Sequence, residues 1–401
     1  MPTESGLATN RPRIFINIAA FGFVLTGIVN TFMGPLLPTL IGRWRLSDSQ
    51  AGYFFALQFL GSILGTVGSA ILMRRGFRVA IAFSYLLMAA GVCGVVMHHW
   101  ESALAGSFVL GMGFGIAIPS TNLLISNAYH ERPAGPLSLL NFCWGLGAVS
   151  VPITIFFISG PKYIFPFLPI LSSVLVLTTF SLAIVSAGGL GPPDKEENSQ
   201  HASRPLHLAA LGAMFFLYVA IESSIGGWIT TLAKRDSAHG LAGLTLAPCL
   251  FWGGLLLGRG IAPLMFMKIR ERHWALAGLS VSVIGIFSLV VVSKWQYIAG
   301  AGFIVGLGLS PVFPITVSLL SQFQKEAARN ASVMFALAGL GGAIMPELVG
   351  IVSTATGSLQ NGLTAPLIAT GALLWLHSRR YSPANDVEDK TSFDDMSLTH
   401  S

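Results

Sequence analysis

Three ionisable residues lie inside long apolar segments of a chain in which only 10% of residues are charged. They are Glu222 in LYVAIESSIGGWITTL, Arg259 in GGLLLGRGIAPLMF and Glu347 in GGAIMPELVGIV. A charged side chain at the centre of a bilayer costs about 2.5–3.5 kcal/mol on insertion scales, so it marks a partner or a water-filled path. A carboxyl group in such a place can exchange a proton, and a guanidinium can pair with a carboxylate or attract an anion.

The composition around these residues predicts a membrane protein. Of 401 residues, 53% are hydrophobic, which is above the usual share for a soluble domain. A bilayer core of ~30 Å accommodates about 20 apolar residues per helix. Hydropathy therefore predicts an all-α membrane protein with twelve transmembrane helices. The expected spans are residues 14–40, 51–73, 79–98, 103–126, 136–160, 164–187, 206–232, 246–267, 274–292, 298–321, 331–354 and 359–377.

The net charge of +6 follows this topology and does not indicate a nucleic-acid partner. If the N-terminus is cytoplasmic, an even number of spans returns the C-terminus to the same side. Of the 23 Lys and Arg residues, sixteen then fall in cytoplasmic segments, six fall outside and one is Arg259. This is the positive-inside bias. We expect a multi-pass protein of the cell (inner) membrane with both termini cytoplasmic, acting as a monomer.

A polar stretch divides the spans six and six. Residues 188–205, GGLGPPDKEENSQHASRP, combine Pro, Gly and charge without an apolar period, as is typical of a flexible linker. We therefore expect an N-terminal six-helix bundle at 1–187, a cytoplasmic linker at 188–205, a C-terminal six-helix bundle at 206–380 and a disordered cytoplasmic tail at 381–401.

The two halves repeat each other in their glycines and prolines. Gly111, Gly113 and Pro119 match Gly306, Gly308 and Pro314 at an offset of 195 residues, and Gly145, Gly147 and Pro152 match Gly339, Gly341 and Pro346 at an offset of 194. Duplicated six-span halves related by an axis along the membrane normal are the architecture of major facilitator transporters, in which substrate lies near the midplane between the halves. We expect two pseudo-symmetric six-helix bundles of this kind.

Four motifs also resemble one family within that superfamily. They are LYVAIESSIGGWITTL in the seventh span, PSTNLLISNAY in the fourth, LLNFCWGLGA in the fifth and GLLLGR in the eighth. These segments are similar to the fucose–proton symporter family and its glucose/galactose-transporter-like relatives. The resemblance implies twelve helices and uptake of a hexose with a proton, or with a sodium ion in some relatives.

The sequence departs from this family at positions that bear on coupling. Proton-linked members have one acidic residue just before LLP in the first span and another four residues before the Asn of the fourth span. Gly34 and Ile118 stand at those places here, and neither can take a proton. Any proton must then be carried by the second half, which leaves Glu222 and Glu347 as candidates.

Superposing the first span on the seventh places Asn30 on Glu222 and Gly34 on Gly226, at an offset of 192 residues. By resemblance these two spans line the central cavity, so we expect both polar side chains to face substrate. Glu347 follows Pro346 in the eleventh span and is either a second titrating residue or the partner of Arg259 in a gating ion pair. Arg259 could instead attract an anionic substrate.

Amides and aromatic residues complete the candidate site, because buried sugar hydroxyls need hydrogen-bond partners. Asn30, Gln58, Asn122 and Asn141 place one amide in each of four spans, although an amide inside the membrane also serves to join helices. Trp144 and Phe313 lie at similar depth, where aromatic side chains are usually packing residues. The expected substrate-binding residues are Asn30, Gln58, Asn122, Asn141, Tyr218, Glu222, Trp228 and Trp252.

These features favour a secondary active transporter for a small neutral solute, most simply a hexose moved with a proton. An efflux transporter, and a sodium-coupled or facilitative sugar transporter, remain as alternatives. The sequence has no nucleotide-binding motif, no nucleophile–base arrangement and no metal-binding spacing. We therefore expect no enzymatic activity, cofactor or metal.

Overall fold

The computed structural model describes residues 4–97, 99–129, 134–157, 161–185, 205–236, 241–266, 270–321 and 327–379. The linker expected at 188–205, apart from its last residue, and the tail expected at 381–401 lie outside the described residues. Regular structure in the described part is helical, as lipid requires, because a helix satisfies its own backbone polar groups.

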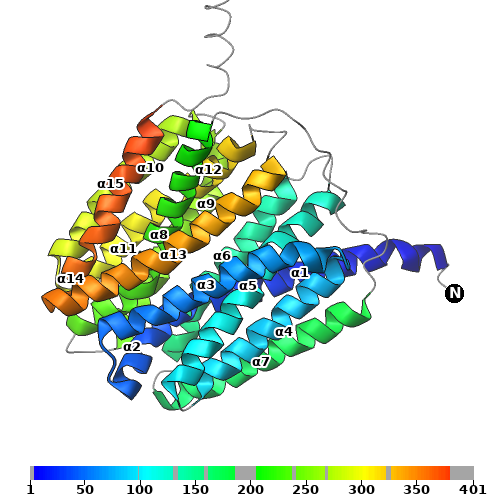
Figure 1. Ribbon diagram of the computed structural model, residues 1–401, viewed down its shortest axis with the longest axis horizontal. Helices are drawn as coiled ribbons and strands as arrows, with labels where there is room; N and C mark the ends of the chain where they lie inside the picture. Colours follow the sequence, from blue (N-terminus) through cyan, green and yellow to red (C-terminus); the bar gives the residue numbers. More distant parts are fainter. Residues whose placement is uncertain are drawn as a thin grey trace, which may run out of the picture.

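The helices form two bundles that lie side by side (Figure 1). The first contains α1 (Glu4–Thr31), α2 (Met33–Trp44), α3 (Asp48–Met73), α4 (Phe77–Val96), α5 (Trp100–Ala128), α6 (Ala134–Phe157) and α7 (Pro161–Ile184). The second contains α8 (Pro205–Asp236), α9 (Leu241–Phe266), α10 (Glu271–Val291), α11 (Trp295–Leu309), α12 (Val312–Ser321), α13 (Ala327–Thr356), α14 (Leu359–Gly362) and α15 (Thr364–Ser378).

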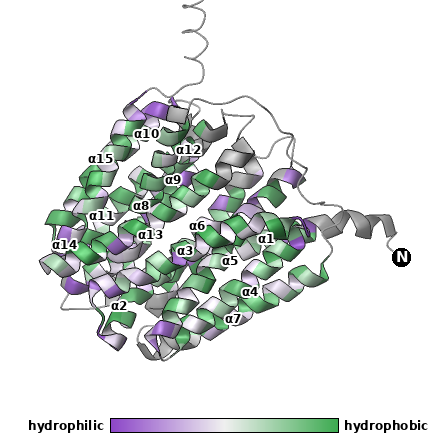
Figure 2. Cartoon of the chain, viewed as in Figure 1, coloured by the Kyte–Doolittle hydropathy of each residue, from purple (hydrophilic) through white to green (hydrophobic). Residues whose placement is uncertain are grey.

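These helices account for the twelve expected spans, six in each bundle. Among the described residues nine helices are long and apolar enough to cross a membrane, and the remaining three spans are α6, α9 and α15. Helices α1 and α2 form the first span, and α11 and α12 form the tenth. Figure 2 shows hydrophobic residues along the helices and hydrophilic residues gathered mostly near their ends.

Proline explains both breaks within a span. Pro35 has no N–H to donate to the carbonyl of Thr31, where α1 ends. Pro311 likewise cannot donate to Leu307, and the hydroxyl of Ser310 donates to that carbonyl at 2.7 Å instead. The sequence predicted one helix in each place, and the structure has two segments because these backbone hydrogen bonds are missing.

The two most extensive contacts between the bundles are helix pairs that the sequence repeat relates to each other. In the α6–α9 pair, Gly145 lies against the side chain of Leu256, and in the α3–α13 pair, Gly339 lies against Ile63. Gly145 and Gly339 are repeat equivalents, and so are Ile63 and Leu256, within one residue of offset. The pseudo-symmetry expected from the sequence is therefore present in the packing between the bundles.

Candidate functional site

A buried ion pair joins two helices of the second bundle near the middle of the membrane-spanning region. The Arg259 guanidinium on α9 lies 3.2 Å from the Glu222 carboxylate on α8, measured from Nη2 to Oε1. The Tyr218 hydroxyl, one turn before Glu222, donates to the same oxygen at 3.0 Å and accepts from Arg259 Nη2 at 3.1 Å. The Arg259 and Glu222 side chains are only 16% and 13% exposed, so the two charges offset each other where neither is fully solvated.

The predicted pairing of Arg259 with Glu347 is wrong. Helix α8 packs on both α9 and α13, so it separates the helix of Arg259 from the helix of Glu347. Glu347 instead lies at the contact with the first bundle, where a methyl group on Gly52 of α3 would come within 2.9 Å of its Cα atom. No ion-pair partner of Glu347 is found among the described residues.

Arg259 also reaches across to the first bundle. Its guanidinium carbon lies 5.8 Å from the ring centroid of Trp144 on α6, within the range of a cation–π contact. Trp144 in turn lies edge-on to Trp252 of α9, with ring centroids 5.9 Å apart. The ion pair therefore sits directly beside the α6–α9 contact between the bundles. The sequence predicted a packing role for Trp144, because the position of an aromatic residue in a span does not reveal which neighbouring helix its ring contacts.

The predicted amides do not form one cluster of free groups. Gln58 Nε2 donates to Asn30 Oδ1 at 3.1 Å, so this pair joins α3 to α1. Asn122 Nδ2 donates to the carbonyl of Ile118 in its own helix at 2.8 Å. Asn141 is exposed near the start of α6. Gln58 thus has the helix-joining role that the sequence left open, and its Oε1 atom is buried without a hydrogen-bond partner among the described residues.

Trp228 is fully buried between three helices. Its indole N–H donates to the carbonyl of Pro346 on α13 at 2.9 Å, and its ring lies 6.1 Å from that of Phe55 on α3. The single donor of this side chain is therefore already used. Tyr218 is equally buried, but it contacts the ion pair directly.

A second polar cluster, which sequence reasoning missed, joins the bundles at the end where α2, α8 and α13 finish and α3 begins, here called the distal end. A capping box of Ser47 and Gln50 starts α3 and sets Asp48 in its first turn. Arg235 of α8 donates from Nη1 to Asp48 Oδ2 at 2.7 Å and from Nη2 to Oδ1. The hydroxyl of Ser353 on α13 also donates to Asp48.

This distal-end cluster could not be predicted by pairing residues along the chain. Asp48 and Arg235 are 187 residues apart, and Asp48 and Ser353 are 305 apart. The signal available in the sequence was that charges flank the ends of the first, second and seventh spans on the same side of the membrane. Asp48 is 7% exposed while Arg235 is 42% exposed, so the cluster borders solvent.

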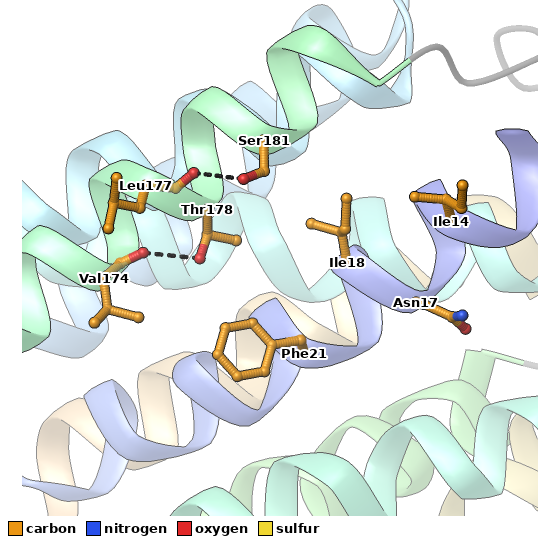
Figure 3. Close-up of a pocket in the computed structure, with 8 residues that line it drawn as sticks. All are labelled: Ile14, Asn17, Ile18, Phe21, Val174, Leu177, Thr178 and Ser181. Atoms are coloured by element: carbon orange, nitrogen blue, oxygen red, sulfur yellow. Dashed lines mark hydrogen bonds between the residues drawn. The ribbon is translucent and has the colours of Figure 1, made fainter.

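An apolar groove of about 490 Å³ lies between α1 and α7, away from both clusters (Figure 3). Ile18 and Phe21 of α1 line it opposite Val174 and Leu177 of α7. The hydroxyl of Thr178 donates to the carbonyl of Val174 in its own helix, so it offers the groove no free donor. The groove has the character of a lipid-facing surface. Among the described residues no group of three or more His, Cys, Asp or Glu side chains is placed to hold a metal ion.

Comparisons with known proteins agree with this architecture. The Bacillus subtilis glucose/mannose transporter GlcP is 22% identical over 352 residues, which cover 82% of this chain and 85% of the relative. A Brucella abortus glucose/galactose transporter is 26% identical over 376 residues, covering 84% of this chain and 86% of the relative.

Solved structures show the same fold at lower sequence identity. A bacterial homologue of the human lysosomal transporter Spinster, in an inward-facing conformation, matches with a TM-score of 0.75 at 13% identity, over 93% of this chain and 99% of the other. FucP in its outward conformation matches with a TM-score of 0.63 at 14% identity, over 92% and 98%.

A family model described as Major Facilitator Superfamily matches residues 19–346, which run from the first span into the eleventh. The resemblance inferred from the repeat and the four motifs is therefore confirmed at this level, and the chain belongs to the Major Facilitator Superfamily.

Proposed function

We propose that this protein is a secondary active transporter that moves a neutral hexose by alternating access, together with a proton. The relatives that cover most of the chain are named as glucose/mannose and glucose/galactose transporters, which supports a sugar substrate. The observation that carries the proposal is the Glu222–Arg259 pair, buried beside the contact between the two bundles. Transporters of this fold bind substrate near the midplane between their halves.

The charge of the site supports a neutral solute. Arg259 would favour an anionic substrate if it stood alone, but Glu222 offsets its charge at 3.2 Å. An anion bound here would compete with an existing carboxylate, whereas a sugar adds no charge to a region of low dielectric. Asn122, whose Nδ2 donates within its own helix, and the exposed Asn141 are proposed to add hydrogen bonds to the sugar.

The same pair supports the proposed proton coupling. Protonation of Glu222 removes the charge that holds Arg259 in place, which frees the guanidinium to shift relative to Tyr218 and the ring of Trp144. Because Trp144 belongs to the other bundle, the protonation state of Glu222 changes a contact between the bundles. A proton bound on one side of the membrane and released on the other would in this way accompany the sugar. Glu347, for which the described residues offer no ion-pair partner, is proposed to have a lesser role in coupling.

The distal-end cluster is proposed to be the closed gate of the opposite side. With both termini cytoplasmic, the distal end faces outward, and Asp48 with Arg235 and Ser353 holds the bundles together there. Opening this end while the other closes gives alternating access, in which two states differ by contacts of this kind.

The decisive experiment is uptake of radiolabelled D-glucose and D-galactose into proteoliposomes, with and without an inward proton gradient. Wild-type protein should accumulate sugar only with the gradient. Glu222→Gln should still exchange sugar in counterflow but should no longer accumulate it, and Glu347→Gln should retain more of the accumulation.

The other outcomes identify the alternatives. Full accumulation by Glu222→Gln would contradict proton coupling through this residue. Accumulation driven by sodium, equilibration without any gradient, or net exit from loaded vesicles would instead indicate a sodium-coupled, facilitative or efflux transporter.

A further inference from the structure

Three neighbouring side chains at the α6–α9 contact each bury an N–H donor that has no hydrogen-bond partner among the described residues. They are the indole nitrogens of Trp144 and Trp252 and the Nε atom of Arg259. Trp144 is 9% exposed and Trp252 is 6% exposed. Buried donors are nearly always satisfied in folded proteins, so a group of three adjacent exceptions requires an explanation.

The three side chains form one cluster in space. Arg259 lies over the Trp144 ring at 5.8 Å, and the Trp144 and Trp252 rings lie 5.9 Å apart. Trp144 and Trp252 stand near the middle of their helices, Ala134–Phe157 and Leu241–Phe266. The cluster therefore lies at the depth and between the halves where a transported solute binds in this architecture.

The cluster brings three N–H donors of this kind together, whereas the other groups without a partner among the described residues include single hydroxyls such as those of Ser120 and Thr230. Trp228 has its indole N–H bonded to a carbonyl, and Gln58 has its amide N–H bonded to Asn30. Those donors bond to other groups of the protein, whereas the described residues offer no acceptor to Trp144 Nε1, Trp252 Nε1 or Arg259 Nε. Oxygen atoms of a bound solute or of water would supply the acceptors that these three donors lack among the described residues.

We propose that Trp144, Trp252 and Arg259 form the sugar-recognition subsite, in which their three N–H groups donate to hydroxyl or ring oxygens of a neutral hexose. The inference rests on the proposed function and adds to it the residues that recognise the substrate. The indole rings supply apolar surface for the C–H face of the sugar. Glu222 offsets the charge of Arg259, so the subsite selects an uncharged sugar over a uronate.

The subsite draws on both halves of the protein. Trp144 belongs to the first bundle, while Trp252 and Arg259 belong to the second. A sugar bound to all three would contact both halves at once. Arg259 would then interact with both the sugar and the carboxylate of Glu222. Substrate and proton would thus act on the same guanidinium.

The test is equilibrium binding to the purified full-length protein in lipid nanodiscs. The probes are D-glucose, D-galactose, their singly deoxygenated analogues and D-galacturonate. Trp144→Phe and Trp252→Phe each remove one N–H while keeping an aromatic ring, and benzothienylalanine, which has the shape of tryptophan without its N–H, replaces a variant that does not fold. Trp375→Phe on α15, where the side chain is 55% exposed, is the matched control.

Each substitution at Trp144 or Trp252 should weaken binding of the hexose by about two- to tenfold, the effect of one lost hydrogen bond. For at least one deoxy sugar the loss should vanish, because that analogue lacks the acceptor. D-galacturonate should bind more weakly than D-galactose, and Trp375→Phe should bind like wild type.

Two results separate the possible failures. If wild-type protein binds neither hexose, the proposed function fails and the subsite with it. If wild type binds a hexose but both variants match it, or lose affinity equally for every analogue, only the subsite is overturned, because the donors are then satisfied by water or the effect is one of packing. Tighter binding of the uronate would overturn the selection for a neutral sugar.

Discussion

Gly34 of α2 lies directly against the backbone carbonyl of Gly226 of α8. The two glycines are repeat equivalents, 192 residues apart in the chain. Equivalent residues of two halves can touch only where the pseudo-two-fold axis passes between them, so this contact marks that axis. It also explains why no acidic side chain stands at position 34, since the backbone of the other bundle occupies the space that a side chain would need.

Gly34→Ala should therefore hinder closure of the two bundles against each other. Overpacking at a tight contact costs about 1–3 kcal/mol, which corresponds to about a five- to 150-fold change in the population of the closed state. We expect sugar counterflow in proteoliposomes to slow accordingly. Gly42→Ala is the matched control in the same helix, because nothing lies within 4 Å of the added methyl group. Equal rates for both variants would contradict the close approach.

Asp48→Asn should release the distal end by weakening its bonds with Arg235 and Ser353. Because the Arg235 side chain is 42% exposed, solvent screens the pair, and its contribution is at the modest scale of surface ion pairs. We expect a shift of about two- to fivefold toward the state open at this end. Spin-label distances between the end of α8 and the start of α3 measure it.

Two further variants test whether the ion pair itself causes that shift. The exchange Asp48→Arg with Arg235→Asp should restore part of the wild-type distance distribution. Glu101→Gln removes an exposed carboxylate from the first turn of α5 and should leave the distribution unchanged. A matching shift in Glu101→Gln would point to general electrostatics at this end.

Removing one member of the Glu222–Arg259 pair should destabilise the protein more than removing both. Arg259→Gln leaves a buried carboxylate without its cation, and breaking a buried pair in this way costs several kcal/mol, up to about 5. The double variant Glu222→Gln with Arg259→Gln leaves no charge to compensate. We expect the apparent Tm of the double variant to lie well above that of Arg259→Gln.

The exposed Lys294 supplies the control for the loss of a cation, and Lys294→Gln should keep the wild-type Tm. Additive losses from the two single substitutions would show that the side chains do not interact energetically.

The linker and both termini should be cytoplasmic, as the distribution of Lys and Arg indicates. In a background without Cys93, Cys143 and Cys249, a cysteine at Ser199 should resist an impermeant maleimide added to intact cells. A cysteine at Ser293, which precedes α11 at the distal end, should react. The reverse pattern of labelling would invert the topology and with it the direction assigned to the gate.

The sequence alone was sufficient to predict the number of spans and their division into two bundles. Long apolar segments fix the number of spans because lipid admits little else than helices there, and the offset of glycines and prolines between halves predicted two related bundles. Glu222 was identified for the same reason, since hydropathy reveals any charge at membrane depth. The breaks at Phe32 and Ser310 were not anticipated, although Pro35 and Pro311 were visible beside them.

Only the tertiary structure decided which residues meet. Hydropathy reports how deep a residue lies and says nothing about which helix it faces, so Glu347 was proposed as the partner of Arg259 and Glu222 was not. The packing of α9 and α13 on α8 determines which carboxylate Arg259 can reach. The docking of the two halves places the Trp144 ring of one half against Arg259 of the other. The pairing of Asp48 with Arg235 could not be predicted for the same reason. Contacts between the bundles depend on how the two halves dock, and no local pattern in the chain encodes that.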